Sequence, residues 1–245
     1  MIHFPSFDEF DIAATFTETR DGNMSLKGEA DVGAVVLARR RVCEALRVPS
    51  ADLVCAEQVH SARIARVDEA DRGRGALDME GALPHVDGLM TNVPGLPLAI
   101  LTADCVPVFL VAPSTRAVAL LHAGRAGTLA NISGTAVRLM NKAYGVRASE
   151  MHAIVGPSAG PESYEVSEEM AREWTLCGLP ADGRRLDLWG ANLAQLEHSG
   201  IPREQIILTE VCTIGGNGFF SYRRDRTPNR NMAILMLRQG AVPSS

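Results

Sequence analysis

Two histidines and one cysteine are the side chains of this chain best suited to do chemistry. His60, Cys105 and His122 each stand at the end of a short run of residues beside tight-turn residues. Imidazole nitrogens and a thiolate are ligands that zinc takes readily, and three protein ligands with one open position are typical of a catalytic zinc site. We therefore predict a zinc site on this trio. Copper is the weaker alternative, since the same donors form the trigonal set of blue-copper centres.

The same residues also have interpretations without a metal. A histidine at a strand end is usually held by hydrogen bonds, and free cysteines are among the most buried residue types. Cys105 is also suited to act as a nucleophile, with a histidine as its base and Asp104 as the group that orients the base. A cysteine enzyme with Cys105 and Asp104 as catalytic residues is the second hypothesis.

Asp104 interrupts the otherwise apolar stretch 98–112. Burying an unpaired carboxylate costs several kcal/mol, so we expect Asp104 to be paired or hydrogen-bonded. It either orients a metal ligand by a hydrogen bond to that residue or caps a turn by accepting from neighbouring backbone N–H groups. The sequence favours neither interpretation.

A turn suited to phosphate is the next chemical feature. Residues 122–128 read His-Ala-Gly-Arg-Ala-Gly-Thr and join an apolar run to a helical pattern. Two glycines at a helix start let an anion approach the backbone, and Arg125 can add a bidentate contact. We expect Arg125 and Thr128 to bind phosphate, although a tight turn with a solvated arginine has the same sequence pattern.

Residues 212–225 concentrate glycines, aromatic residues and arginines. Tyr222 and Arg223 would suit the wall of a pocket for a flat, polar ligand. A surface hairpin with solvated arginines is the alternative, and the composition favours it.

The spacing of apolar residues indicates which elements position these side chains. Helical spacing predicts helices at residues 31–46 (capped by Asp31), 128–144 and 167–176 (capped by Ser167), with a fourth ending at 198. Short apolar runs predict strands at residues 53–58, 63–67, 98–101, 106–111, 117–121, 151–155, 186–189, 205–208 and 232–237. Residues 68–84, rich in glycine and acids, are expected to form a mobile loop.

Helices and strands alternate along the chain, but several neighbouring strands are joined by short turns. This pattern indicates a mixed α/β arrangement rather than a purely parallel sheet. Because no linker divides the sequence, we expect a single domain over residues 1–245.

Composition and charge exclude several classes of protein. A net charge of -5 leaves no broad cationic surface, so no nucleic-acid partner is expected. The most apolar stretch is too short to span a membrane, and residues 1–10 lack the features of a signal peptide. The five cysteines form no CxxC pair, which argues against a disulfide framework. We expect a cytoplasmic protein.

Motifs for other chemistries are missing from the sequence. It contains no GxxxxGK[ST] and no GxGxxG after a predicted strand, which argues against nucleotide-triphosphate and dinucleotide folds. It also lacks the HxE and PCxxC signature of zinc base deaminases. The absence of a His-x-His pair makes a multi-copper cluster hard to build.

Taken in order, several stretches resemble the family of multicopper polyphenol oxidoreductases (laccase-domain proteins), whose members are also described as purine nucleoside phosphorylases. The DGL, TADC and FFSYRR blocks are specific in this order, and the resemblance runs from about residue 15 to 237. The stretches are 19–26 (TRDGNMSL), 58–60 (QVH), 87–91 (DGLMT), 102–107 (TADCVP), 121–124 (LHAG), 156–161 (GPSAGP), 164–166 (YEV), 212–213 (CT) and 219–225 (FFSYRRD).

The resemblance implies an α+β fold with mixed β-sheets and helices packed on the outside. It implies that His60, Cys105 and His122 are zinc ligands, and that Arg20 in the first stretch takes part in binding substrate or phosphate. The implied activity is phosphorolysis of adenosine, inosine and methylthioadenosine, with adenosine deamination also described. For bacterial members it further implies a role in the quality control of peptidoglycan precursors.

Other functions stay open beside this one. They are a cysteine-nucleophile hydrolase of peptidoglycan-precursor type, a copper polyphenol oxidase and a non-enzymatic binding subunit. The physiological substrate, the metal in the cell and the oligomeric state do not follow from the sequence.

The chain departs from the family pattern at two places. Members usually read HAGWRG where this chain has HAGRAG at 122–127, so Arg125 stands one position early and the tryptophan is missing. They usually read GPCIG where this chain has Ser158. Because the metal trio is unchanged, these departures bear on substrate choice and on the anion contact.

Overall fold

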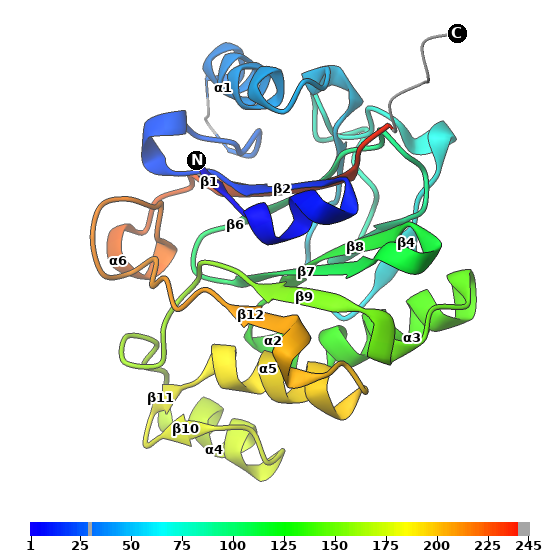
Figure 1. The fold of residues 1–245 in the computed structure, drawn as a ribbon. Helices are drawn as coiled ribbons and strands as arrows, with labels where there is room; N and C mark the ends of the chain where they lie inside the picture. The colour runs from blue at the N-terminus through cyan, green and yellow to red at the C-terminus, as the bar shows by residue number, and fades with distance from the viewer. Residues whose placement is uncertain (29–30, 240–245) are drawn as a thin grey trace, which may run out of the picture.

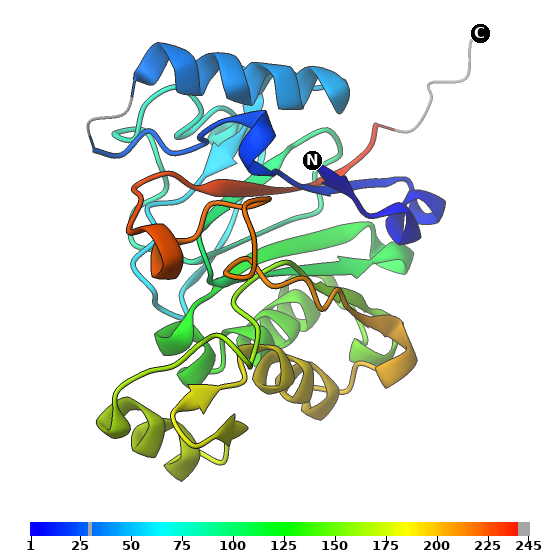
Figure 2. The ribbon, with the colours of Figure 1, turned by 90° about the vertical axis from the view of Figure 1, so that its left-hand side faces the viewer.

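The computed structural model describes residues 1–28 and 31–239 of the chain. Two β-sheets pack face to face, one helix covers the outer face of the first sheet, and a group of helices covers the outer face of the second (Figure 1). The view turned by 90° shows the same layers, with α1 above the sheets and α2, α3 and α5 below them (Figure 2). The predicted α+β class with helices on the outside is confirmed.

The first sheet has five strands in these residues, and β13 lies at its centre. β13 pairs antiparallel with both β2 and β6, whereas β3 runs parallel to β6. Alternate residues of β13 pack in opposite directions, with Ile234 in the cluster under α1 and Leu235 in the cluster between the sheets. The strand order is β1 (Ile2–His3), β2 (Ile12–Phe16), β13 (Asn231–Leu237), β6 (Leu98–Thr102) and β3 (Val54–Cys55).

The second sheet has six strands and carries the register that matters for the site. β7 and β8 pair antiparallel with Val106 opposite Ala123 and Pro107 opposite His122. β5 pairs antiparallel with β8, with Gly88 opposite Leu121. These registers bring Cys105, Asp87 and His122 to one end of the sheet. The strand order is β12 (Ile206–Leu208), β9 (His152–Val155), β7 (Val106–Ala112), β8 (Ala117–Ala123), β5 (Gly88–Thr91) and β4 (Ile64–Arg66).

The helices bury apolar faces against the sheets. Val42 and Cys43 of α1 pack on the five-stranded sheet, and Ala136 and Met140 of α3 pack on the six-stranded one. The helices are α1 (Val32–Ala45), α2 (Arg125–Leu129), α3 (Ile132–Tyr144), α4 (Glu168–Leu176), α5 (Leu188–His198) and α6 (Tyr222–Asp225), and a small ribbon beside α4 consists of β10 (Ala181–Asp182) and β11 (Arg185–Leu186). Short 3-10 turns span Pro5–Phe10, Thr19–Asp21, Ser50–Asp52, Glu69–Asp71, Pro113–Thr115, Ala148–Glu150 and Arg203–Gln205.

Two helix predictions are confirmed together with their caps. The carboxylate of Asp31 accepts a hydrogen bond from the backbone N–H of Ala34 at the start of α1. The hydroxyl of Ser167 accepts one from Met170 at the start of α4. In both cases the cap satisfies an N–H group that has no partner within the helix.

The predicted helix over residues 128–144 is wrong as a single element. α2 ends at Leu129 and α3 begins at Ile132, because Asn131 takes a left-handed conformation (φ 55°). The Asn131 side chain accepts a hydrogen bond from Gly134 and so starts a new helix. A short apolar pattern cannot show such a break, since the side-chain spacing continues across it.

Two predicted strands differ from the observed elements. Of the predicted strand 186–189, only Leu186 lies in a strand, as the end of β11, and α5 begins at Leu188 because Asp187 caps this helix by accepting from Gly190. Over 53–58 only Val54–Cys55 pairs as a strand. Residues 68–84, the predicted loop, contain one 3-10 turn at Glu69–Asp71 and no strand among the described residues.

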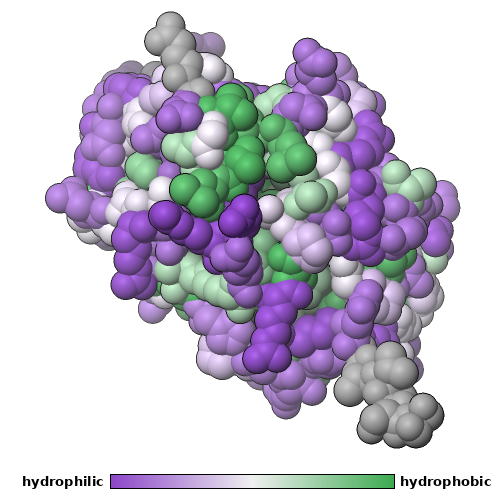
Figure 3. Space-filling view, turned by 90° about the horizontal axis from the view of Figure 1, so that it is seen from above, coloured by the Kyte–Doolittle hydropathy of each residue, from purple (hydrophilic) through white to green (hydrophobic). Residues whose placement is uncertain are grey.

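Seen from the α1 side, the surface is largely polar, and a broad apolar area lies in the upper part of the view (Figure 3). Val32 and Leu37 of α1 are exposed. Across the described ranges, no helix combines the length and the hydropathy needed to cross a membrane.

Candidate metal centre

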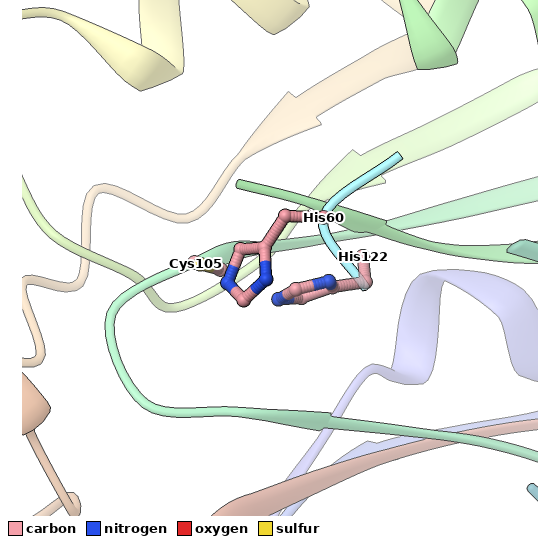
Figure 4. A group of neighbouring side chains, drawn as sticks. All are labelled: His60, Cys105 and His122. Atoms are coloured by element: carbon pink, nitrogen blue, oxygen red, sulfur yellow. The ribbon is translucent and has the colours of Figure 1, made fainter. Parts of the chain in front are cut away.

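The structure brings His60, Cys105 and His122 together, although they are far apart in the sequence. Each offers one ligand atom, and these atoms all lie within 4.8 Å of one another. The two imidazole rings are 4.8 Å apart between centroids and meet edge to face at 70°. Figure 4 shows the two rings side by side, with Cys105 next to His60.

Two of the three residues are positioned by the six-stranded sheet. Cys105 is the last residue of the turn between β6 and β7, directly before Val106. His122 lies in β8 beside this turn, because Pro107 is its partner in the β7–β8 ladder. The antiparallel pairing of β7 with β8 therefore fixes the distance between the thiol and the imidazole.

His60 comes from a loop that a buried carboxylate holds in place. Asp87, fully buried just before β5, accepts hydrogen bonds from the backbone N–H groups of Val59 (3.2 Å), His60 (2.9 Å) and Ser61 (2.6 Å). The Ser61 hydroxyl adds a fourth at 2.8 Å. His60 adopts a left-handed backbone conformation (φ 62°), which is uncommon for a residue other than glycine.

Asp87 also orients His122. Its Oδ1 lies 2.8 Å from His122 Nδ1, so that nitrogen donates to the carboxylate and Nε2 is left free to act as a ligand. Burial would raise the pKa of Asp87, but hydrogen bonds from His122 and Ser61 outweigh it and lower the pKa to about 2. Sequence reasoning assigned no role to Asp87, although an aspartate directly before a buried strand (Gly88–Thr91) was a signal for one.

Gly124 leaves the space in which the three ligands meet. A Cβ atom at this position would lie 2.9 Å from Cys105 Sγ and 3.0 Å from His60 Cδ2. Any other residue would push the ligands apart. Two imidazoles and a thiolate around an open space fit a zinc ion, so these residues are suited to hold a metal.

The electrostatics of the pair Cys105 and His122 favour the ligand form of the thiol. Burial opposes ionisation of Cys105, but His122 and His60 outweigh it and lower its pKa to about 6. Burial also disfavours a charged His122, whereas Cys105 and Asp87 raise its pKa to about 9. The sulfur is thus held as a thiolate by its neighbours.

Asp104 forms its hydrogen bonds with residues outside the trio. Its buried carboxylate accepts hydrogen bonds from the hydroxyl of Thr213 (2.8 Å) and from the backbone N–H of Arg223 (2.7 Å). Like His60, Asp104 has a positive φ (88°). It ties the turn before Cys105 to the loop around α6, which agrees with the interpretation as a turn cap rather than as an orienter of a ligand.

The trio lies in the wall of a cavity of about 780 Å³. Arg125 lines it too, and its guanidinium donates to Glu173 at 2.8 Å. Other residues of the wall include Ser25, Lys27, Gln58, Met79, Leu101, Asp104, Tyr164, Leu188, Tyr222, Arg223, Pro228 and Arg230. The predicted pocket residues Tyr222 and Arg223 are therefore at the cavity.

Both of these C-terminal residues are already engaged in cation–π contacts. The guanidinium of Arg223 lies 4.9 Å from the ring centroid of Tyr164. Two arginines, Arg226 and Arg230, lie over the Tyr222 ring at 5.3 and 5.8 Å. The cavity wall is therefore an aromatic and cationic surface.

Two predicted binding residues lie outside this cavity wall. Thr128 is buried between α2 and α5, where its hydroxyl accepts from Asn192 at 3.1 Å. The side chain of Arg20 is 72% exposed and pairs with Glu18. We do not retain either as a phosphate ligand, because Thr128 faces the helix layer and Arg20 faces solvent.

Comparison with known proteins places these observations in a family. Residues 15–238 match the family model described as multi-copper polyphenol oxidoreductase laccase. The chain is 40% identical to a purine nucleoside phosphorylase, YlmD, of Geobacillus stearothermophilus over 229 residues, covering 89% of this chain and 84% of that protein. It is 34% identical to the adenosine deaminase RL5 of an unknown prokaryotic organism, covering 79% of this chain and 78% of that protein.

Solved structures share the fold. The crystal structure of the hypothetical protein YfiH of Bacillus licheniformis superposes with a TM-score of 0.89 at 30% identity, covering 97% of this chain and 96% of that one. YlmD of Geobacillus stearothermophilus gives a TM-score of 0.88 at 37% identity, covering 94% and 93%. With its fold, its relatives and the matched segment in agreement, the chain belongs to the multi-copper polyphenol oxidoreductase laccase family.

Proposed function

We propose that this protein is a zinc-dependent purine nucleoside phosphorylase. The observation that carries the proposal is the convergence of His60, Cys105 and His122 in the wall of a cavity that also contains Arg125. The relatives named purine nucleoside phosphorylase support the reaction class. Adenosine, inosine and methylthioadenosine are the substrates we propose.

His60, Cys105 and His122 would hold the zinc ion, with Asp87 as the residue that positions both histidines. Zinc bound by three protein ligands supplies a Lewis acid that polarises an oxygen atom of a ligand in the open position. The chain's own contribution is to fix the ligands: Asp87 holds the His60 loop and the Nδ1 of His122 before any substrate enters.

Arg125 would bind the attacking phosphate. In phosphorolysis a phosphate oxygen forms a bond to C1′ of the ribose while the bond from C1′ to the purine nitrogen breaks. The purine leaves with the electron pair of that bond and takes up a proton, matching the one that hydrogen phosphate gives up on becoming an ester, so ribose 1-phosphate and the free base result. Arg125 positions the phosphate for this step, and Asp104 holds the turn that carries Cys105.

The aromatic and cationic wall would hold the nucleoside. Tyr164, Tyr222 and Arg223 offer a surface for a flat, polar base. The volume of the cavity, about 780 Å³, lies in the range that is usual for small-molecule sites. The partners are thus a nucleoside and phosphate. We propose the cytoplasm as the compartment, and a single domain over the whole chain, as the sequence predicts.

Adenosine deamination is a second candidate, which one relative's name favours. In that reaction a water oxygen adds to C6 of the purine and ammonia leaves. It needs no phosphate. Phosphate dependence therefore separates the two reactions on one protein.

The test is an Arg125→Ala variant assayed for release of free base from inosine and adenosine at varied phosphate, with zinc content measured in parallel. Loss of phosphate-dependent base release with zinc retained supports the proposal. Arg138→Ala, on the exposed face of α3, is the matched control and should behave like the wild type. Unchanged phosphate kinetics in Arg125→Ala would remove this arginine from the proposal. Ammonia release without phosphate would favour the deaminase.

A further inference from the structure

Arg125 already has an anionic partner within the protein. Its Nη1 lies 2.8 Å from the Oε2 of Glu173. The Arg125 side chain is 24% exposed, whereas the Glu173 side chain is 59% exposed. The ion pair thus joins α2, which begins next to the metal trio, to α4, since Glu173 lies 48 positions after Arg125 in the chain.

Glu173 projects from a firmly anchored helix. Its neighbour Trp174 is fully buried and donates its indole N–H to the Pro180 carbonyl at 2.8 Å. Ala171 of the same helix is also buried in the core. The backbone of Glu173 is therefore fixed, and only its exposed side chain is free to turn away from Arg125.

The other arginines of the cavity wall have neutral partners. Arg223 donates to the backbone carbonyl of Glu165, and Arg230 donates to those of Thr227 and Asn229. Within the part of the chain that the structure describes, neither forms an ion pair. Arg125 differs from them in facing a carboxylate, and it is also the residue that stands one position early in HAGRAG.

We propose that Glu173 is an internal competitor that sets the anion affinity of the cavity. The inference rests on the proposed function, in which Arg125 binds phosphate. A phosphate must displace the Glu173 carboxylate before it can take the guanidinium in a bidentate contact. Because the carboxylate is tethered, it competes at a fixed effective concentration whatever the phosphate concentration is.

The size of the effect follows from the exposure of the pair. Exposed ion pairs are weak, so removing the competitor should tighten anion binding by about two- to fivefold rather than by orders of magnitude. Since the competitor is part of the protein, every oxyanion that binds Arg125 should gain by the same factor. Phosphate and sulfate should therefore improve equally.

The experiment is calorimetric titration of the full-length protein with inorganic phosphate and, separately, with sulfate. It compares the wild type with Glu173→Gln, Glu169→Gln and Arg125→Ala. Glu169 is an exposed glutamate one turn earlier in α4, so its variant makes the same change of charge without touching the pair. Anion binding is read directly and does not depend on turnover.

We expect Glu173→Gln to bind both anions about two- to fivefold more tightly, Glu169→Gln to match the wild type, and Arg125→Ala to lose most of the affinity. Equal affinity in Glu173→Gln and the wild type, or an equal gain in Glu169→Gln, would overturn the competitor while leaving the phosphorylase proposal intact. Phosphate binding that is unchanged in Arg125→Ala, or absent from the wild type, would overturn the phosphate site itself and the competitor with it.

Discussion

Two cysteines of this protein lie beside basic side chains, and their thiols have opposite properties. Cys55 lies under α1, with its sulfur 3.9 Å from Nη1 of the buried Arg39. Burial raises the pKa of Cys55, even though Arg39 acts against it. Cys105 lies beside His122 and His60, which lower its pKa to about 6 against the effect of burial.

The difference lies in how the N–H groups of the basic side chain are shared among acceptors. Arg39 donates to the Cys55 sulfur only at 3.9 Å, whereas its shorter hydrogen bonds, at 2.7 to 3.0 Å, go to the backbone carbonyls of Met24, Gly75 and Ala76. Its charge is therefore shared with oxygen atoms that need donors. A cation that donates to a thiol is thus not sufficient to lower its pKa where burial is complete and the shorter hydrogen bonds of the cation go to other acceptors.

Replacing Arg39 tests the first member of this comparison, in which a buried cation beside Cys55 stabilises the fold, and it should have the largest effect. In Arg39→Met the three carbonyls lose their donors inside a packed layer, and we expect unfolding to become easier by about 3 kcal/mol. Urea denaturation measures this. The exposed neighbour gives the control Arg40→Met, which should stay within about 0.5 kcal/mol of the wild type. If Arg39→Met lowers the free energy of unfolding by less than about 0.5 kcal/mol, the buried guanidinium does not stabilise the fold.

Replacing Asp87 tests the second member of the comparison, the site of Cys105, His60 and His122. Asp87→Asn keeps the volume but loses the charge that holds His122 and the His60 loop, so zinc affinity should fall about 10- to 100-fold. Competition with a chromophoric chelator measures this affinity. Asp187→Asn is the matched control: it changes another carboxylate that accepts a backbone N–H, that of Gly190 at the start of α5, and it should retain the affinity. Equal losses in both variants would show that Asp87 has no special role.

The alkaline pH dependence of stability should separate the two kinds of thiol. Burial raises the pKa of Cys43, in the same layer as Cys55, to about 12 from 9.0. Below pH 9 both folded and unfolded chains keep this proton. Above pH 9 the unfolded thiol ionises first, so its contribution to stability falls as the pH rises, by about 1.4 kcal/mol at pH 10.

Urea denaturation at pH 8 and pH 10 checks this expectation. The difference in stability between the wild type and Cys43→Ala should shrink by that amount between the two pH values. A difference that stays constant would show that Cys43 does not titrate differently in the folded and unfolded states.

Much of the fold follows from local pattern. The helix capped by Asp31 and the strand over 232–237 (observed at Asn231–Leu237) could be predicted, because apolar periodicity and capping residues are local properties. The break at Asn131 could not, since it depends on one residue in a left-handed conformation. The start of α5 at Leu188 was missed because Asp187 acts as a cap within a run that reads as a strand.

The sequence predicted the ligand residues of the site, but not the residues and strand pairing that position them. His60, Cys105 and His122 stand out by residue type and by their motifs. The convergence of these residues depends on the β7–β8 register, and the role of Asp87 depends on a loop folding over it. Thr128 was misplaced because the turn at Gly124 directs it to α5. The pairing of Arg125 with Glu173 joins distant segments and leaves no local signal.

Metal content measured by elemental analysis on the untagged protein is the most direct test of the metal centre. Three proteins should be compared: the wild type, a His60→Ala/Cys105→Ala variant and a Cys43→Ala/Cys55→Ala variant. The proposal predicts close to one zinc ion per chain in the wild type and in the Cys43→Ala/Cys55→Ala protein, and none in the His60→Ala/Cys105→Ala protein. Metal that persists without His60 and Cys105, or a wild type without metal, would contradict the metal centre. In the latter case Cys105 becomes the candidate nucleophile, and copper in place of zinc would favour the oxidase.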